Sequence, residues 1–138
     1  MNPVRRYMAL GLLVSAGLLA QGCTSTVSKG ISDDGKQASE VIFPDAAKSH
    51  VKEGTLPALE HFHKVRPGIS KDQLYAMFGV PHFSDGIAGV REWDYVFQLQ
   101  GSKDKEPTQC QFKIIFDKNN KGQSFYWSPK DCAQKVGM

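Results

Sequence analysis

Apolar and polar positions alternate along the carboxyl-terminal half of the chain, which is the pattern of half-buried β-strands. In residues 91–99, aromatic and aliphatic side chains fall on one face, whereas Glu92 and Asp94 fall on the other, where we expect them to be solvated. The alternation returns in residues 110–116 and 123–127, and the segments between are rich in residues that favour turns. The pattern therefore predicts three antiparallel strands.

Two short helices are predicted ahead of these strands, because apolar residues recur there at spacings of three or four. The first covers residues 57–65 and ends at an Arg-Pro-Gly sequence, since proline cannot continue helical hydrogen bonding. The second covers residues 71–78 and ends at Gly79. Its start is marked by Ser70 and Gln73, which have the spacing of a capping box.

The amino terminus carries the pattern of an export signal. Arg5 and Arg6 precede an apolar run of 14 residues, 7–20, which is too short to cross about 30 Å of hydrocarbon comfortably. Cys23 follows directly after small residues and resembles the acylation site of a bacterial lipoprotein signal, although Ala20 stands where leucine is usual. We expect cleavage before Cys23 and attachment of lipid to its thiol. An ordinary signal peptide and an uncleaved anchor are the alternatives.

An acylated Cys23 would hold the mature protein on a membrane, because each buried acyl CH₂ contributes about 0.8 kcal/mol and several chains act together. The next residue is Thr24 rather than the aspartate that marks retention at the inner membrane. This favours the outer membrane, with the folded part facing the periplasm. Residues 23–54 hold few apolar side chains and are predicted to form a flexible tether.

Length and charge limit the rest of the chain to one small domain. Cleavage of residues 1–22 leaves 116 of the 138 residues, and it lowers the formal charge from +3 to +1 because both signal arginines are removed. A nearly neutral mature protein gives no electrostatic reason to expect nucleic acid as a partner. The predicted folded domain covers residues 55–132, followed by a C-terminal tail over residues 133–138.

The two remaining cysteines, Cys110 and Cys132, are predicted to form a disulfide, because an exported protein folds in an oxidising compartment. If Phe116 pairs with Gln123 in a hairpin, Cys110 falls opposite residue 129, close to Cys132. The bridge would close a loop of about 22 residues, which corresponds to about 3 kcal/mol in the chain-entropy estimate. A redox or metal-binding pair is the alternative, but the sequence has no Cys-x-x-Cys motif and no histidine beside either thiol.

Residues that could serve in catalysis or metal binding are scattered along the chain. His61 and His63 are two positions apart, so a helix would point them about 200° apart and prevent them from sharing one metal. On a strand they would share a face, and Glu60 or His82 could then supply a third ligand. The sequence has no phosphate loop, nucleophile elbow or HExxH motif. We therefore expect neither an enzyme, nor a bound metal, nor a cofactor.

Three motifs follow one another within residues 56–127. They are Arg66-Pro67-Gly68-Ile69-Ser70 between the helices, Phe78-Gly79-Val80-Pro81 after the second helix, and the strand Glu92-Trp93-Asp94-Tyr95-Val96-Phe97. In this order the chain resembles the SmpA/OmlA (BamE-like) family of small outer-membrane lipoproteins. The resemblance implies an α+β fold in which two short helices pack on a three-stranded antiparallel sheet. The cysteine pair and the long segment 43–54 depart from the family's pattern and are similar to osmotically inducible lipoproteins of the same superfamily.

The resemblance implies a non-catalytic outer-membrane lipoprotein that supports envelope integrity, as a scaffold or assembly factor for β-barrel proteins. An alternative from another class is a stress-induced binding module that recognises anionic phospholipid, peptidoglycan or, as an inhibitor would, a protein target. Family members work through exposed surfaces, so some side chains are expected to face a partner. The candidates are Leu56, Phe62, Arg66, Arg91 and Tyr126. For each of them the alternative is an ordinary packed or solvated residue.

Overall fold

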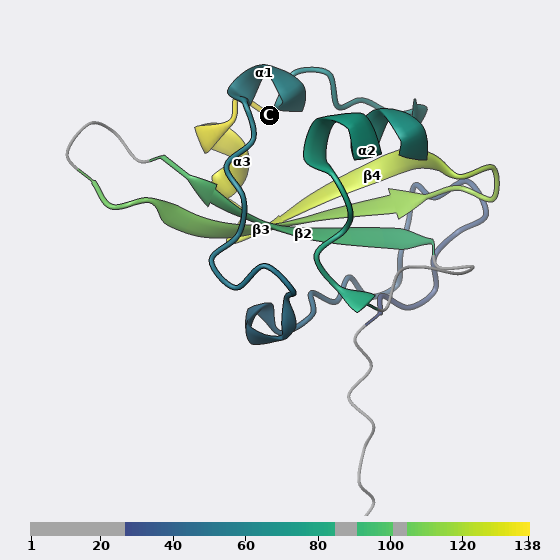
Figure 1. The fold of residues 1–138 in the computed structure, drawn as a ribbon. Coiled ribbons are helices and arrows are strands. Elements are labelled where there is room, and N and C mark those ends of the chain that lie inside the picture. The colour runs from purple at the N-terminus through teal and green to yellow at the C-terminus, as the bar shows by residue number, and fades with distance from the viewer. Residues whose placement is uncertain (1–26, 85–90, 101–104) are drawn as a thin grey trace, which may run out of the picture.

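The computed structural model describes residues 27–84, 91–100 and 105–138, so the export signal and Cys23 lie outside the described residues. Over these ranges the chain forms three α-helices, a 3₁₀-helix and four strands, which confirms the predicted α+β class. In chain order the elements are η1 (Ala46–Lys48), α1 (Leu59–Phe62), β1 (Ile69–Ser70), α2 (Lys71–Phe78), β2 (Glu92–Leu99), β3 (Thr108–Phe116), β4 (Lys121–Ser128) and α3 (Cys132–Lys135). Figure 1 shows the three α-helices above the sheet and η1 below it.

The sheet is antiparallel throughout, with the strand order β1-β4-β3-β2. The three predicted strands are present, although Phe116 lies opposite Gly122 rather than Gln123 because of an irregularity in the register. The expected three-stranded sheet is wrong by one strand within the described ranges. The additional strand, β1, consists of Ile69 and Ser70 alone, and two residues carry no alternation that a sequence pattern could reveal.

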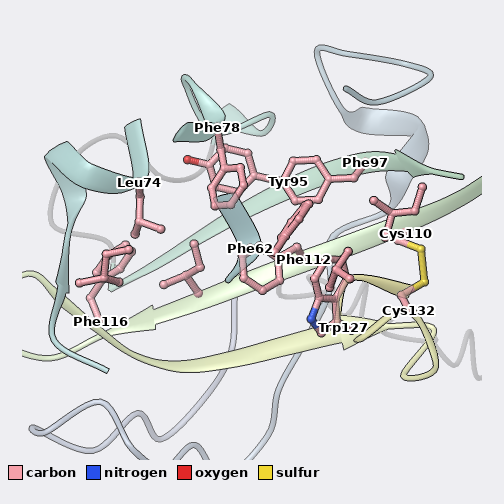
Figure 2. Packing of buried hydrophobic residues seen from close by; sticks show 14 residues of the cluster. Phe62, Leu74, Phe78, Tyr95, Phe97, Cys110, Phe112, Phe116, Trp127 and Cys132 are labelled. Atoms are coloured by element: carbon pink, nitrogen blue, oxygen red, sulfur yellow. A yellow bond between two sulfur atoms is a disulfide. The ribbon is translucent and has the colours of Figure 1, made fainter. Parts of the chain in front are cut away.

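The inner face of the sheet and the helices enclose an aromatic core. Phe62 of α1 and Phe78 of α2 are buried with their ring centroids 5.1 Å apart, and both contact Phe97 of β2 (Figure 2). Helix α2 begins and ends where the sequence predicts. The Ser70 hydroxyl accepts a hydrogen bond from the Gln73 backbone N–H, which confirms the predicted capping box.

Helix α1 is shorter than expected, and the prediction of a helix over residues 57–65 is correct only for Leu59–Phe62. Ala58 at its N-cap makes no side-chain hydrogen bond, and the α-helix ends at Phe62. A single helical turn is unstable by itself, because nucleation costs more than one turn of hydrogen bonds returns. Packing of the buried Phe62 side chain on the sheet therefore holds α1 in place.

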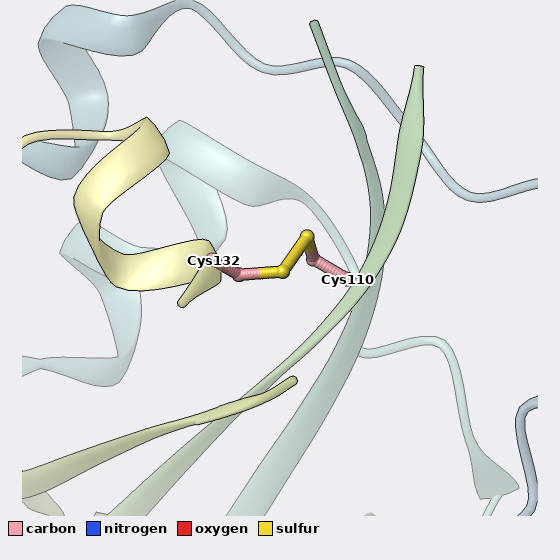
Figure 3. The surroundings of a disulfide bond; sticks show 2 residues. All are labelled: Cys110 and Cys132. Atoms are coloured by element: carbon pink, nitrogen blue, oxygen red, sulfur yellow. A yellow bond between two sulfur atoms is a disulfide. The ribbon is translucent and has the colours of Figure 1, made fainter. Parts of the chain in front are cut away.

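The last residues are part of the domain, so the expectation of a C-terminal tail over residues 133–138 is wrong. Helix α3 packs on the sheet, and Val136 directly after it is 2% exposed. Figure 3 shows the disulfide that joins Cys132 at the start of α3 to Cys110 in β3, with Cα atoms 6.2 Å apart. Cys132 and Val136 are four positions apart and share one helical face, which is too short a pattern to be recognised in the sequence.

Residues 27–54 lie against the outer face of the sheet, so the expectation of a flexible tether over residues 23–54 is wrong from residue 27 onward. Near its start, the Ser28 N–H donates to the Glu92 carboxylate at 2.9 Å. Similar hydrogen bonds reach the segment from side chains of β3 and β4. The polar composition of the segment is misleading because side chains of the strands hold it in place through hydrogen bonds.

Candidate interaction surfaces

Three of the five predicted partner-facing residues are accessible. Leu56 leads into α1 and is 57% exposed, and Arg66 is exposed in the connection between α1 and β1. Tyr126 is half-buried on β4, beside residues of the segment that covers the outer face. These three side chains remain candidates for contact with a partner.

The prediction that Phe62 faces a partner is wrong, and Arg91 is partly buried by contacts within the domain. Phe62 is 1% exposed, because its ring lies among aromatic rings of α2 and of the three long strands. The Arg91 guanidinium donates to the Phe116 carbonyl at 2.8 Å and to the Ser32 carbonyl at 2.6 Å. Arg91 therefore fastens residues before η1 to the end of β3. The sequence could not reveal this, because a cation at the end of a strand is equally compatible with a solvated position.

Arg66 lines a groove of about 310 Å³ between the connection after α1 and helix α2. We call this the α1–α2 groove, and its lining consists of Lys64, Arg66, Ile69, Gln73, Ala76 and Met77. The lining combines two cations with apolar side chains and includes no carboxylate. On α1, Leu59 is 56% exposed, as Leu56 is just before it. The lining of the groove suits a partner segment that carries acidic and apolar side chains.

A buried charge cluster lies on the outer face of the sheet. Lys113 of β3 is fully buried, and its ammonium lies 3.0 Å from a Glu92 carboxylate oxygen and 2.8 Å from one of Asp94. The Phe43 ring lies near the same ammonium, with its centroid 5.7 Å away. The expectation that Glu92 and Asp94 are solvated is therefore wrong, because residues 27–54 cover this face. The Lys113 ammonium is shared between the two carboxylates, and Glu92 also accepts from the Ser28 N–H of the covering segment.

His50 and His82 are neighbours, because the His50 backbone N–H donates to the His82 carbonyl, whereas His61 lies apart from them on α1. His61 Nδ1 lies 3.1 Å from the Met77 carbonyl oxygen, and His50 Nε2 lies 2.7 Å from the Ser84 hydroxyl. His61 lies on helix α1, while His82 is buried beside β2. Within residues 27–84, 91–100 and 105–138, no three histidine, cysteine or acidic residues come together in a way that could hold a metal ion.

His82 occupies the outer edge of β2 and is 4% exposed. Its Nδ1 accepts a hydrogen bond from the Val96 N–H at 2.9 Å, and its backbone N–H donates to the Asp94 carbonyl. Burial lowers the pKa of the His82 imidazole below its usual range, so the ring is neutral at pH 7. A neutral imidazole thus closes part of this edge, a role that a single histidine in the sequence does not reveal.

The described chain begins at Val27, so lipidation of Cys23 stays a prediction. In the part of the chain that the structure does describe, none of the helices has the length and the apolar content that crossing a bilayer requires.

Comparison with known families agrees with this architecture. The chain matches the outer membrane protein assembly factor BamE domain over residues 54–125, which is more than half of its length. The match begins where Thr55 bridges to Phe97 in β2 and ends within β4, so it contains α1, α2 and the α1–α2 groove. With this match and this fold, the chain belongs to the BamE domain family of outer membrane protein assembly factors.

Proposed function

We propose that the protein is a non-catalytic, lipid-anchored assembly factor for β-barrel proteins of the outer membrane. The match to the BamE domain over residues 54–125 carries this proposal, because the family consists of assembly factors. The sequence around Cys23 supports the lipid anchor, and Thr24 supports the outer membrane as its location, with the domain in the periplasm.

The α1–α2 groove is the surface that we assign to an assembly partner. An assembly factor needs no reactive group, because it acts by binding and orienting other proteins. Apolar contacts at Ala76 and Met77, which line the groove, would supply affinity at roughly 25 cal/mol per Å² of buried area. Cationic Arg66 would attract acidic groups and increase the rate of association.

Affinity purification from detergent-solubilised envelopes, with mass spectrometry of the proteins that co-purify, tests this proposal. We expect the wild-type protein to recover components of the β-barrel assembly machinery. Arg66→Glu should recover several-fold less, because a reversed charge at the groove opposes association. Lys48→Glu is the matched control, since Lys48 is exposed on η1 and does not line the groove.

Two results would contradict the proposal. Recovery of anionic phospholipid or peptidoglycan without any assembly protein would favour the envelope binding module instead. Equal recovery by Arg66→Glu and the wild-type protein would exclude the α1–α2 groove as the contact surface.

A further inference from the structure

We propose that the outer edge of β4 is a binding site for an extended peptide segment, which adds to the sheet as a further strand. The site lies on a different part of the molecule from the α1–α2 groove, and the inference does not depend on the proposed function. It rests on a difference between the two edges of the sheet, because other segments of the chain hydrogen-bond to the β2 edge but leave most of the β4 edge open.

The edge formed by β2 is closed by other parts of the chain. The Asp94 carbonyl accepts from the His82 backbone, and the Val96 N–H donates to the His82 ring. Thr55 then donates to the Val96 carbonyl and accepts from the Gln98 N–H. The outward-facing backbone N–H and C=O groups on alternate residues of β2 thus have hydrogen-bond partners within the chain. Proteins commonly protect an edge strand from unwanted pairing by covering it in this way.

The opposite edge is covered only where β4 begins. Ile69 and Ser70 of β1 lie opposite Gly122 and Lys121, and the chain before them turns away at Gly68, whose φ is +93°. From residue 123 to residue 128, no strand among the described residues lies beside this edge of β4.

The register of the sheet shows which groups of β4 point outward. The Phe116 N–H is directed to the β2 side, so Ile115 faces β4 and pairs with Ser124. The alternating pattern then directs the backbone N–H and C=O groups of Phe125 and Trp127 toward the open edge. Neither residue has a backbone hydrogen bond on this side within the described chain. An extended peptide supplies the groups that would pair with them.

A groove of about 510 Å³ lies at this edge, and its walls come from both faces of the sheet. We call it the β4 edge groove. It is lined by Val41, Phe43 and Tyr126 on the outer face, by Phe125, Trp127 and Ala133 on the inner face, and by Lys130 after β4. Successive side chains of a strand point to opposite faces, so an added strand would contact both walls in turn.

Trp127 contributes its side chain to the wall of the groove and its backbone to the open edge. Its side chain is 7% exposed, and its Nε1 has no acceptor in the described part of the chain. Because this Nε1 atom is itself enclosed, an added strand would pair with the Trp127 backbone rather than with the indole. Lys130 adds a preference for an acidic side chain. The occupant is therefore an extended segment with apolar side chains and one acidic residue.

Nuclear magnetic resonance of the full-length protein in detergent micelles tests this site. The probe is a synthetic peptide of about six residues in which valine alternates with threonine before a final aspartate. We expect the Phe125 and Trp127 backbone amides to exchange rapidly in the free protein and slowly with the peptide, and the Trp127 indole resonance to shift. The Val96 and Gln98 amides at the closed edge should not change.

Two N-methylated peptides of identical composition provide the matched control. One carries methyl groups on the alternate backbone nitrogens that face β4, and the other carries them on the nitrogens that face away. The first should bind at least about tenfold more weakly, because it loses backbone hydrogen bonds to β4, whereas the second should bind like the parent peptide. Lys130→Glu should weaken binding several-fold, and Lys48→Glu should not.

Three results with the peptides would overturn the proposal. The parent peptide could fail to bind at millimolar concentration, or both methylated peptides could bind equally weakly. The peptide could also bind without slowing amide exchange at Phe125 and Trp127. Protection of these two amides that increases with protein concentration, in the absence of peptide, would also overturn it. That result would indicate pairing between the β4 edges of two copies of the chain.

Discussion

Lys113 is the residue on which the covered face of the sheet depends. Its ammonium is fully buried between Glu92 and Asp94, and Glu92 also accepts a hydrogen bond from the Ser28 N–H. Loss of one member of a buried charge cluster leaves the others desolvated and uncompensated. Breaking such a cluster therefore costs more stability than replacing it completely with neutral groups.

We expect Lys113→Met to lower the free energy of unfolding by about 3 to 5 kcal/mol, because two buried carboxylates lose their cation. Urea denaturation followed by tryptophan fluorescence measures this change. A triple variant that also carries Glu92→Gln and Asp94→Asn removes all three charges and should regain most of the loss. If the triple variant were as unstable as Lys113→Met, lost packing rather than uncompensated charge would be the cause.

His82 makes the stability of the fold depend on pH. In an unfolded chain a histidine titrates at about pH 6.5, whereas burial lowers the pKa of His82 in the folded protein. Below about pH 6.5 the unfolded state therefore binds a proton that the folded state does not, so the free energy of unfolding decreases as the pH falls toward the folded pKa. Above about pH 6.5, His82 is neutral in both states and does not make the free energy of unfolding depend on pH.

We expect His82→Asn to flatten this part of the stability curve, because asparagine does not titrate and can still accept from the Val96 N–H. Urea denaturation at about pH 7.5 and about pH 5.5 gives the comparison, and the two values bracket the pKa of an unperturbed histidine. His63→Asn is the control, since His63 is exposed at the end of α1 and is not among the groups that shift the pKa of His82. Equal slopes in the wild-type protein and in His82→Asn would contradict the prediction.

Among the elements, those with a repeated pattern or an explicit end signal could be predicted from the sequence. Helix α2 has a capping box at Ser70 and a glycine at its end, and β2, β3 and β4 each alternate over several residues. Elements of a single turn or a single residue pair could not be predicted. They are α3 and β1, and the correct extent of α1 also escaped prediction.

The segment 27–54 and the candidate surfaces show a second limit of prediction from sequence, because they depend on contacts between residues far apart in the chain. The Ser124 hydroxyl donates to the Gly35 carbonyl, a contact between residues 89 positions apart, and no local pattern announces it. For the same reason the sequence could suggest Leu56 and Arg66 as exposed but could not distinguish them from the buried Phe62. Exposure at these positions depends on which face of α1 packs on the sheet.

The disulfide fixes the carboxyl-terminal element to the sheet. We expect the double variant Cys110→Ala, Cys132→Ala to lower the free energy of unfolding by about 3 kcal/mol, because the unfolded chain regains the freedom of the loop that the bridge closes. Alanine avoids placing two hydroxyl groups in the buried positions. Wild-type protein unfolded in the presence of a reductant should show a loss of similar size. Alkylation of both thiols in folded protein taken from envelopes would contradict the prediction.

For the molecule as a whole, ordering of residues 27–54 changes the relation between the domain and its expected anchor. Only residues 24–26 separate Cys23 from Val27, where the described segment begins. An extended chain spans at most about 3.6 Å per residue, so Val27 lies within about 14 Å of Cys23. If Cys23 is acylated, the domain is therefore held close to the lipid surface rather than on a long tether. A partner has to reach the α1–α2 groove in that position.

The anchor itself gives a prediction about the location of the whole protein. Cys23→Ser should leave an unprocessed precursor or a product that is released from the membrane, because serine lacks the thiol that receives the lipid. Membrane fractionation, with mass spectrometry of the amino-terminal peptide, measures location and lipid together. The double variant Cys110→Ala, Cys132→Ala is the control and should keep both the lipid and the membrane location, since these cysteines are joined to each other within the domain. Recovery of cleaved, unlipidated Cys23→Ser protein in the outer-membrane fraction would show that a protein contact, rather than the lipid, holds the molecule there.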